Sequence, residues 1–419
     1  MAKKQKKRSD KQKLRDFFMD DLAESRTSTP ACRHFGECGG CEFQDVPYDR
    51  QLDAKLRAAR FILDAVILGM EEEPEKAARL TAMREAPQPD IIASPRQFGY
   101  RQRMDYVFAF DSAGLRKANR HRHVVPLEEC PLLGERAFAV FQKAKTLAVR
   151  AGLESYNYLR HVGELRYFVV RQTRDGQTLL SLVTKTDTRK DDVLGVLRQL
   201  HDDGDIASGH WLLAPGLGDV SFGQPLAFVG GDSIVETMNG VRLRIGPNTF
   251  FQSNPAVAEK AYAAIRDFCP ENGEALDLYS GVGGIGLSIA RKANRVTSVE
   301  NVPENVTLAR ANIADNNAAN VTLVLEDSTA YLRARAAQSD IPPPALAVVN
   351  PPRPGVEGDG MALLSALGPD RIAYLSCNPF TLFRNLADIL DTYAVRSLTI
   401  YDMFPQTRHF ESLALLEKR

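Results

Sequence analysis

The feature that most constrains the fold is a glycine-rich turn that follows an apolar segment and leads into a helical one. The strand-like run 275–279 passes directly into the segment 280–286, which reads SGVGGIG in one-letter code. Glycine residues permit a tight turn, and they let backbone N–H groups approach a ligand at the start of the following helix. Because glycine turns also follow strands for structural reasons, this turn predicts a ligand site only in a matching context.

Strands and helices alternate on both sides of this turn. Strand-like runs are expected at 275–279, 296–300, 321–325, 345–349 and 372–376. Helices are expected at 255–268, 285–292, 304–315 and 381–390. This alternation predicts an α/β domain over residues 246–419, with a parallel, doubly wound, Rossmann-like sheet. Ligands of such sheets bind at the carboxyl ends of the strands, so the residues that directly follow the strands form the candidate site.

The first three strands of the predicted sheet end in candidate cofactor-binding residues. Gly281 and Gly283 shape the turn, and Glu300 closes the second strand, where an acid could accept hydrogen bonds from ribose hydroxyls. Asp327 follows the third strand and is a candidate cofactor contact. It is equally well explained as a solvated acid at a strand end. The layout serves dinucleotide enzymes and class I S-adenosylmethionine (SAM) methyltransferases alike. The sequence DLYSGVG at 277–283 is similar to the second group.

The fourth and fifth strands end in residues that could carry chemistry. The fourth ends at Asn350 and the fifth leads into Cys377, so both should face the same crevice as the glycine turn. A cysteine before a helix is a candidate nucleophile, because a helix N-terminus lowers the pKa of a thiol. By contrast, Cys269 is expected to be an inert core residue. Glu411 could act as a general base if the fold brings it beside Cys377, and would otherwise be a surface glutamate.

Four further cysteines form a candidate metal site. They are Cys32, Cys38, Cys41 and Cys130. Six cysteines in 419 residues, with no apolar secretion signal, indicate a reducing, cytoplasmic setting in which clustered cysteines bind metal or do chemistry. The spacing is compatible with either zinc or an iron–sulfur cluster. No apolar run approaches the roughly 18–20 residues that cross a bilayer, so no membrane association is expected.

Charge is balanced over the whole chain, with 53 basic and 53 acidic residues, but its distribution is uneven. The first fifteen residues carry eight basic side chains and one acid, Asp10. We expect residues 1–30 to be a disordered tail that either contacts phosphates or only aids solubility. Residues 31–245 are expected to form a second, β-rich α+β domain with a connecting amphipathic helix at 48–68.

A basic segment of this second domain is the candidate RNA surface. Between residues 96 and 123, seven basic side chains face two acids, and two tyrosines are interleaved with them. Such a cluster favours phosphate contact, although any single member could belong to an ordinary solvated face. The basic residues are Arg96, Arg101, Arg103, Arg116, Lys117, Arg120 and Arg122.

Several motifs occur together in one order. They are FFQSN at 250–254, the glycine turn, NPPR at 350–353, SCNP at 376–379 and DMFPQTRHFE at 402–411. From about residue 31 onward the chain closely resembles the RNA uracil-5-methyltransferases, which make 5-methyluridine in transfer and ribosomal RNA. The resemblance implies that Cys377 is the nucleophile and Glu411 the base. It also implies SAM contacts from four residues, which are Gln252, Tyr279, Glu300 and Asn350.

The resemblance extends to the four cysteines. Iron–sulfur members of the family show Cys-x5-Cys-Gly-Gly-Cys followed by a glutamine, here Gln44, and a distant Cys-Pro. A 4Fe–4S cluster held by Cys32, Cys38, Cys41 and Cys130 is therefore expected. Many members also carry a small β-barrel RNA-binding domain before the cysteines, which we expect to be missing here. The cysteine set favours ribosomal RNA (23S rRNA) as the substrate, and transfer RNA is the alternative.

One residue departs from the family pattern. The family usually has aspartate where this chain has Asn350, which keeps an acceptor oxygen but loses the charge. Weaker attraction to the cationic cofactor is expected, with the same reaction. The departure also supports an alternative of another class, a non-catalytic RNA-binding or chaperoning protein that retains the fold. A monomer without an obligatory protein partner is expected in either case.

Overall fold

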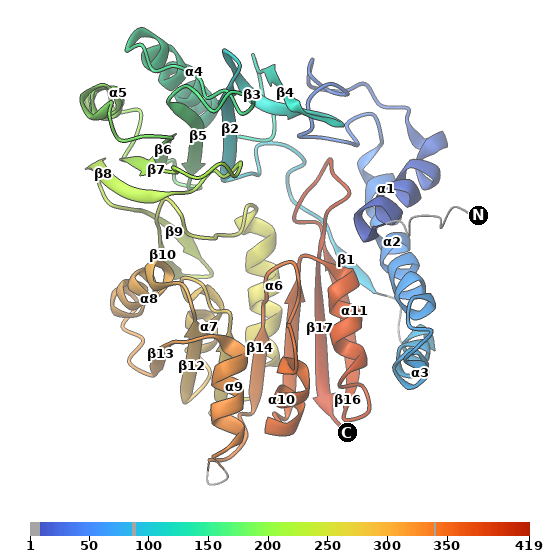
Figure 1. Cartoon of the computed structure of the whole chain (residues 1–419). Helices are drawn as coiled ribbons and strands as arrows, with labels where there is room; N and C mark the ends of the chain where they lie inside the picture. Colours follow the sequence, from blue (N-terminus) through green and yellow to red (C-terminus); the bar gives the residue numbers. More distant parts are fainter. Residues whose placement is uncertain (1–8, 86–88, 339–340) are drawn as a thin grey trace.

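The computed structural model describes residues 9–85, 89–338 and 341–419 (Figure 1). The α-helices are α1 (Asp10–Asp21), α2 (Tyr48–Leu68), α3 (Pro74–Ala82), α4 (Glu135–Arg150), α5 (Lys190–Asp202), α6 (Pro255–Phe268), α7 (Gly284–Ile289), α8 (Pro303–Asp315), α9 (Ser328–Ala336), α10 (Gly360–Leu367) and α11 (Pro379–Ala387). The strands are β1 (Asp90–Ile92), β2 (Arg103–Ala109), β3 (Ser112–Lys117), β4 (Arg120–Pro126), β5 (Leu165–Gln172), β6 (Thr178–Thr184), β7 (Ser208–Leu213), β8 (Gln224–Gly230), β9 (Ile234–Met238), β10 (Val241–Ile245), β11 (Glu274–Leu278), β12 (Arg295–Glu300), β13 (Val321–Leu325), β14 (Leu346–Val349), β15 (Arg371–Ser376), β16 (Tyr393–Tyr401) and β17 (Glu411–Lys418).

The larger sheet has the strand order β1-β16-β17-β15-β14-β11-β12-β13. Strands β15, β14, β11, β12 and β13 run parallel, and β17 is antiparallel to both of its neighbours, β15 and β16. Parallel strands covered on both faces read as continuous apolar runs, and all four residues of β14 are buried. Helices α2 and α11 pack on one face, and α6 and α7 pack on the other. The predicted doubly wound α/β architecture is confirmed.

The smaller sheet has the order β4-β3-β2-β5-β6-β7-β8 and is antiparallel except between β6 and β7. Helices α4 and α5 bury their apolar faces against it. The β-rich α+β character expected for this region is therefore confirmed. The hairpin of β9 and β10 turns at Asn239 and Gly240, both with positive φ as such tight turns require. Its apolar side packs against α6 and α7 of the larger sheet.

The N-terminal segment differs from its prediction as a disordered tail. Residues 10–21 form α1, and the side chains of Phe18 and Leu22 are buried in the core beside α2. The high charge of this segment conceals an apolar stripe at helical spacing, which supplies the buried face that a solvated tail would lack. The prediction is wrong for this part of the chain, whereas residues 1–8 lie outside the described residues.

The helix expected at 48–68 has the same bounds in the structure, as α2. It packs on the larger sheet, and β1 pairs with β16 at the edge of that sheet. Elements from the segment 31–92 therefore support the α/β half, although the sequence grouped them with the β-rich half. The division of the chain at residues 30 and 245 into domains stays a prediction. Within the described ranges, no helix is long and apolar enough to cross a membrane.

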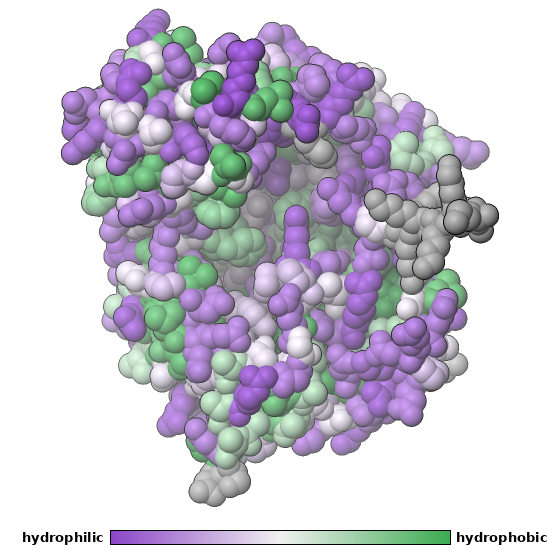
Figure 2. All heavy atoms as spheres, viewed as in Figure 1, coloured by the Kyte–Doolittle hydropathy of each residue, from purple (hydrophilic) through white to green (hydrophobic). Residues whose placement is uncertain are grey.

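A cleft of about 2530 Å³ lies between the two sheets. Figure 2 shows the molecule hollowed between its upper part, which holds the smaller sheet, and its lower part. The carboxyl edge of the larger sheet forms one side, and α1, the cysteine-bearing segment 35–43 and the ends of β2 and β3 contribute to the rest. The predicted site is therefore the floor of this cleft.

Candidate active site

The register of β15 and β17 brings the predicted nucleophile and base together. Ser376, the last residue of β15, pairs with Ser412 of β17. The next positions along this register are Cys377 and Glu411, the first residue of β17, and the charge of Glu411 acts on the Cys377 thiol. Residues directly opposite in an antiparallel pair have Cβ atoms about 4.5–5.5 Å apart. Both side chains line the cleft, and Glu411 is otherwise buried.

Burial changes the acidity of both groups. It raises the pKa of the Glu411 carboxyl to about 8, against the opposing charge of Arg353. Burial, and then the neighbouring Glu411, raise the pKa of the Cys377 thiol to about 11, although Arg353 opposes this through charge and a hydrogen bond. The net shift is therefore upward, whereas the sequence predicted a lowering of the thiol pKa by a helix N-terminus. Cys377 precedes the N-cap of α11, and the side chain of Asn378 already accepts the Phe380 N–H at 3.2 Å.

Arg353 is the residue of this site that the sequence argument missed. It follows β14, and its carbonyl oxygen accepts a hydrogen bond from the Asn378 side chain at 3.0 Å. The loop after β14 is thus fastened to the N-terminus of α11. The arginine at the fourth position of the motif at 350–353 was the available signal, because a cation there can offset buried acidic groups.

Backbone conformation shapes the glycine turn. Tyr279 has a φ of 59°, which is unusual for a bulky residue, and Gly283 has a φ of 87°. A Cβ atom on Gly286 would lie 2.8 Å from Oδ2 of Asp277, so only glycine fits there. The Gly281 N–H donates to Oε2 of Glu300 at 2.8 Å, which ties the turn to the end of β12.

Six of the seven predicted cofactor-binding residues line the cleft, and Gly283 lies inside the turn without reaching it. The six are Gln252, Tyr279, Gly281, Glu300, Asp327 and Asn350. Asp327 also caps α9, accepting hydrogen bonds from the N–H groups of Thr329 and Ala330 at 3.0 Å. Capping α9 is by itself enough to explain Asp327, which the sequence also allowed as a solvated acid at a strand end. Contact of the seven residues with a cofactor stays a prediction.

The four N-terminal cysteines are free thiols drawn from two distant segments. The Gly39 N–H donates to the Arg116 carbonyl at 2.9 Å, so the first segment lies along β3. Burial raises the pKa of Cys38 to about 11 and that of Cys41 to about 12, and the other cysteines of the group add to both shifts. Across residues 9–85, 89–338 and 341–419, no three His, Cys, Asp or Glu side chains are arranged to hold a metal ion. The predicted iron–sulfur site is not shown.

The cysteine segment is joined to the loop that leads into Glu411. The N–H groups of Glu42 and Phe43 both donate to the Gln406 carbonyl, at 2.8 and 3.1 Å. Arg408 forms an ion pair with Glu42. Gln406 has a φ of 67°, and its backbone N–H donates to the side chain of Gln51 on α2 at 3.0 Å.

A buried ion pair holds the start of the same loop. Lys55 of α2 lies 2.5 Å from Asp402, and both side chains are fully buried. The Tyr48 hydroxyl donates to the second oxygen of Asp402 at 2.7 Å, and Lys55 also donates to the Phe404 carbonyl at 3.1 Å. Helix α2 therefore fixes the segment between β16 and Glu411.

The predicted basic surface is divided by the fold. Arg101, Arg103, Arg116 and Lys117 line the cleft, whereas Arg96, Arg120 and Arg122 do not. Three of the four cleft residues have acidic neighbours. These pairs are Arg103 with Asp105 at 2.7 Å, Arg116 with Asp219 at 2.6 Å and Lys117 with Glu37 at 2.8 Å. The positive field of this wall is therefore weaker than the sequence indicates.

Comparison with known proteins agrees with this geometry. The tRNA (Uracil-5-)-methyltransferase family profile matches residues 239–419. A 23S rRNA (uracil(747)-C(5))-methyltransferase of Cronobacter sakazakii is 32% identical over 91% of this chain and 97% of its own length. A tRNA (uracil(54)-C(5))-methyltransferase of Pyrococcus furiosus is 30% identical over 92% of this chain and 85% of its own length.

A solved structure extends the likeness to three dimensions. The tRNA (uracil-54, C5)-methyltransferase of Pyrococcus abyssi, crystallised with S-adenosyl-L-homocysteine, is 27% identical and superposes with a TM-score of 0.73. The match covers 90% of this chain and 86% of that one, so it includes both sheets. By sequence and by fold, the chain belongs to the tRNA (uracil-5-)-methyltransferase family of RNA-modifying enzymes.

Proposed function

We propose that this protein is an enzyme that transfers a methyl group from SAM to carbon 5 of a uridine in RNA. The observation that carries the proposal is the register of β15 and β17, which brings Cys377 opposite Glu411 on the cleft floor. A thiol and a carboxyl facing each other beside a glycine turn suit a reaction that needs one nucleophile and one base.

The residues of the turn fit an adenosine-type cofactor. Oδ1 of Asp277 and Oγ of Ser280 are buried and have no hydrogen-bond partner within the described residues. Glu300 offers a buried carboxylate at the end of β12, where a ribose would lie. Apart from its two chain neighbours, no described residue lies within 4 Å of a Cβ atom built on Gly281, so the turn is open on its cleft side. SAM, when bound, supplies an electrophilic methyl group.

The chemistry requires the residue types at 377 and 411. Carbon 5 of uracil is a poor nucleophile until the Cys377 thiolate bonds to carbon 6 and turns the ring into an enolate. Carbon 5 then accepts the methyl group, and Glu411 removes the proton from carbon 5. The sulfur–carbon bond breaks, carbons 5 and 6 regain their double bond, and the thiolate returns. A carboxylate with a pKa near 8 is a stronger base than an ordinary glutamate.

Arg353 helps Cys377 to become a thiolate. Burial alone would leave almost no thiolate at neutral pH, and the hydrogen bond and charge of Arg353 oppose that effect. Asn350, which directly precedes Pro351 in the same loop, can offer an amide donor and an acceptor to the cofactor or the uracil edge. Because it carries no charge, it attracts a cationic cofactor less than aspartate would, with the reaction unchanged.

The substrate must reach this floor as an unpaired, flipped base. Flipping costs a few kcal/mol and is easiest in an RNA loop. The cleft has two exposed aromatic side chains on which neighbouring bases could stack, Phe222 and Phe250, with 56% and 67% of their surfaces accessible. Arg101 adds a cation to the same cleft. These features support single-stranded RNA as the substrate class.

Ribosomal RNA is the proposed substrate, with transfer RNA as the alternative. The four-cysteine set favours the former, and the relatives named above include enzymes for both. We further propose a monomeric, cytoplasmic enzyme. The intact pair of Cys377 and Glu411 argues against a non-catalytic RNA-binding protein, for which the neutral Asn350 is the supporting residue.

A 4Fe–4S cluster is proposed for the N-terminal cysteines. Four thiols from two segments influence one another's acidity, so they lie near one another. The side-chain amide of Gln44 is buried beside Cys41 and lowers its pKa through a hydrogen bond, so it could also donate to a cluster sulfur. A cluster separates its cysteine sulfurs more widely than a single ion does. It would fasten the segment 32–41 to Cys130 and so brace the cleft wall.

The test uses RNA labelled with tritium at carbon 5 of uridine. The wild-type enzyme should release tritium and incorporate methyl groups only with SAM present, whereas the variant Cys377→Ala should do neither above background. Mass mapping of ribosomal and transfer RNA from a deletion strain identifies the target. Parental methylation by Cys377→Ala would disprove the mechanism. RNA binding without tritium release by the wild type would favour the non-catalytic alternative.

A further inference from the structure

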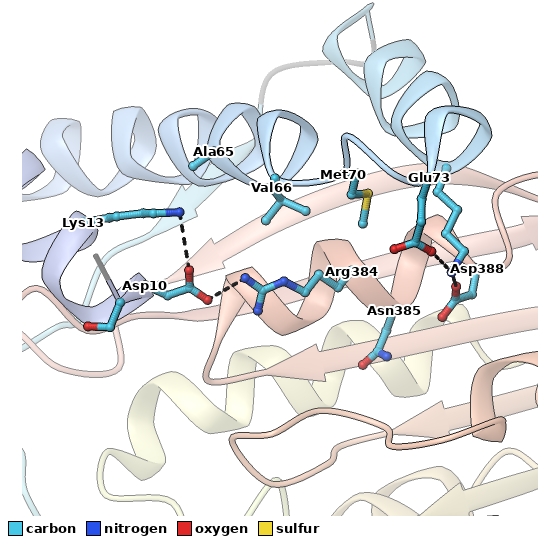
Figure 3. A pocket seen from close by; sticks show the side chains of 12 residues that line it. Asp10, Lys13, Ala65, Val66, Met70, Glu73, Arg384, Asn385 and Asp388 are labelled. Carbon is cyan, nitrogen blue, oxygen red and sulfur yellow. Dashed lines mark hydrogen bonds and ion pairs between the residues drawn. The ribbon is translucent and has the colours of Figure 1, made fainter. Parts of the chain in front are cut away.

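Helix α1 presents two different faces. Residues Lys11, Gln12 and Arg15 line the same cleft as Cys377 and Glu411. At 100° per residue these three share one side of the helix. Lys13 lies on the other side, over a small cavity of about 490 Å³ between α1, α2 and α11 (Figure 3).

The helix is held firmly in this position. Phe17 stacks on Phe61 of α2 with ring centroids 4.7 Å apart, and Phe18 is buried. Asp21 accepts two hydrogen bonds from Arg57 of α2, both at 2.8 Å. Figure 3 shows Asp10 reaching Arg384 of α11, at 2.6 Å. Since α11 begins two residues after Cys377, this last ion pair fixes α1 relative to the proposed nucleophile.

Acidic side chains of α1 attach the helix to its neighbours, whereas basic side chains of α1 face the cleft. Asp10 and Asp21 pair with arginines of α11 and α2, as described above. Within the described part of the chain, Lys11 and Arg15 form no ion pair. The opposite wall is different, because Arg103, Arg116 and Lys117 there each have an acidic neighbour. Among the described residues, α1 therefore adds two cations without an ion pair to the cleft, beside Arg101 of the opposite wall and Arg353 of the floor.

We propose that α1 is one wall of the RNA-binding groove, where Lys11 and Arg15 contact the phosphates of the strand that carries the target uridine. The inference rests on the proposed function for the identity of the strand. The occupant is RNA because the face is cationic, polar and continuous with the cleft that holds the catalytic pair. Such contacts position the backbone and carry no base information themselves.

The experiment compares a double variant, Lys11→Gln with Arg15→Gln, against Lys13→Gln, which loses the same kind of charge from the other face. Binding of fluorescently labelled, unmodified tRNA and 23S rRNA transcripts is measured over a range of salt concentrations. The salt slope is the decrease in the logarithm of the binding constant per unit of the logarithm of the salt concentration. Loss of two phosphate contacts should lower it by about 1.4–1.8, at 0.7 to 0.9 per contact. The affinity gap to wild type should then shrink by roughly tenfold between 50 and 200 mM salt.

Kinetics and rescue complete the test. The double variant should raise KM for RNA with kcat unchanged, and Lys13→Gln should behave as wild type. A charge-conserving pair, Lys11→Arg with Arg15→Lys, should restore the wild-type slope, which a folding defect would not allow. A wild-type slope and KM in the double variant would overturn the role of α1. If the wild type methylates no uridine, the proposed function fails, and the binding slopes still test the helix.

Discussion

Cys377 and the N-terminal cysteines lie in different kinds of backbone: Cys377 follows a strand at the centre of a sheet, and the others lie outside regular strands. Cys377 follows β15, which is hydrogen-bonded on both sides, to β14 and to β17. Cys32, Cys38 and Cys41 lie in a segment of turns and irregular backbone, and Cys38 makes an isolated bridge to Lys117 of β3. The sheet thus determines where the sulfur of Cys377 lies. The sulfurs of the other three cysteines are not placed by a strand that is paired on both sides.

The difference matches the two roles that we propose for cysteine in this chain. The proposed nucleophile needs a fixed partner, and the register of β15 and β17 leads Cys377 toward Glu411 without any bound group. The proposed cluster ligands would gain their fixed positions from the group that they bind. The two regions meet where the Gln406 carbonyl accepts hydrogen bonds from Glu42 and Phe43. Changes at each region and at their junction should therefore have separable effects.

The largest effect is expected at Glu411. Replacing it by glutamine removes the base for the carbon 5 proton, and loss of a general base costs about 10²–10⁴-fold in rate. The Cys377 thiolate can still add to the ring, so a covalent RNA adduct should accumulate on denaturing gels. Neither an adduct nor slower turnover would remove Glu411 from this role. The free energy of unfolding should not fall, since the variant relieves burial of an ionisable group.

The pH dependence of the same variant separates the two groups. Glu411 and Cys377 must both lose a proton, and burial raises both pKa values, to about 8 and about 11, so the rate rises with pH. Below the pKa of Glu411 the wild-type rate should increase by about two powers of ten per pH unit, and above it by about one. Adduct formation by Glu411→Gln should increase by about one power of ten throughout. A bell-shaped wild-type profile centred near pH 7 would contradict this assignment.

The next largest effect is expected at the buried pair that holds the loop before Glu411. Lys55→Met leaves Asp402 buried without its cation, which costs about 3–5 kcal/mol in the free energy of unfolding. The double variant Lys55→Met with Asp402→Asn removes both charges and should recover much of this loss. Urea unfolding measures both. Exposed ion pairs contribute less than about 1 kcal/mol to the free energy of unfolding. A loss this small for Lys55→Met would mean that the loop does not depend on the pair.

The sequence predicts local features of this fold well and long-range contacts poorly. The apolar periodicity of 48–68 predicts α2, and the strand ends predict which residues share the cleft. No local pattern indicates that Lys55 meets Asp402, because the partners lie 347 residues apart. The pairing of β1 with β16 is hidden for the same reason. For α1, the high charge of the segment led to the prediction of a disordered tail, although Leu14, Phe17 and Phe18 have helical spacing.

A smaller effect on catalysis is expected in the cysteine segment. Anaerobically purified protein should be brown and contain near-stoichiometric iron, and Cys41→Ser should lose both. The free energy of unfolding should fall by about 3 kcal/mol, because a bound group present at a hundredfold above its dissociation constant stabilises the folded protein by about this amount. Cys269→Ser is the matched control, because Cys269 is buried apart from the other cysteines. Wild-type protein that is colourless and free of iron would refute the cluster.

The smallest effect is expected at the junction of the two regions. Glu42→Gln removes the ion pair with Arg408, whose side chains are 34% and 11% exposed. Such a partly solvated pair contributes about 0.2–1 kcal/mol, and the two backbone hydrogen bonds to Gln406 remain in the variant. We therefore expect a small loss of stability and little change in kcat.

The matched control at the junction is Glu37→Gln. It removes another ion pair of the cysteine segment, with Lys117, and that pair does not reach the catalytic loop. If the backbone alone positions the loop, both variants should retain wild-type kcat. A kcat that falls in Glu42→Gln but not in Glu37→Gln would mean that the ion pair itself holds Glu411 in place. In that case the cysteine segment is part of the catalytic machinery, and the two regions act as one.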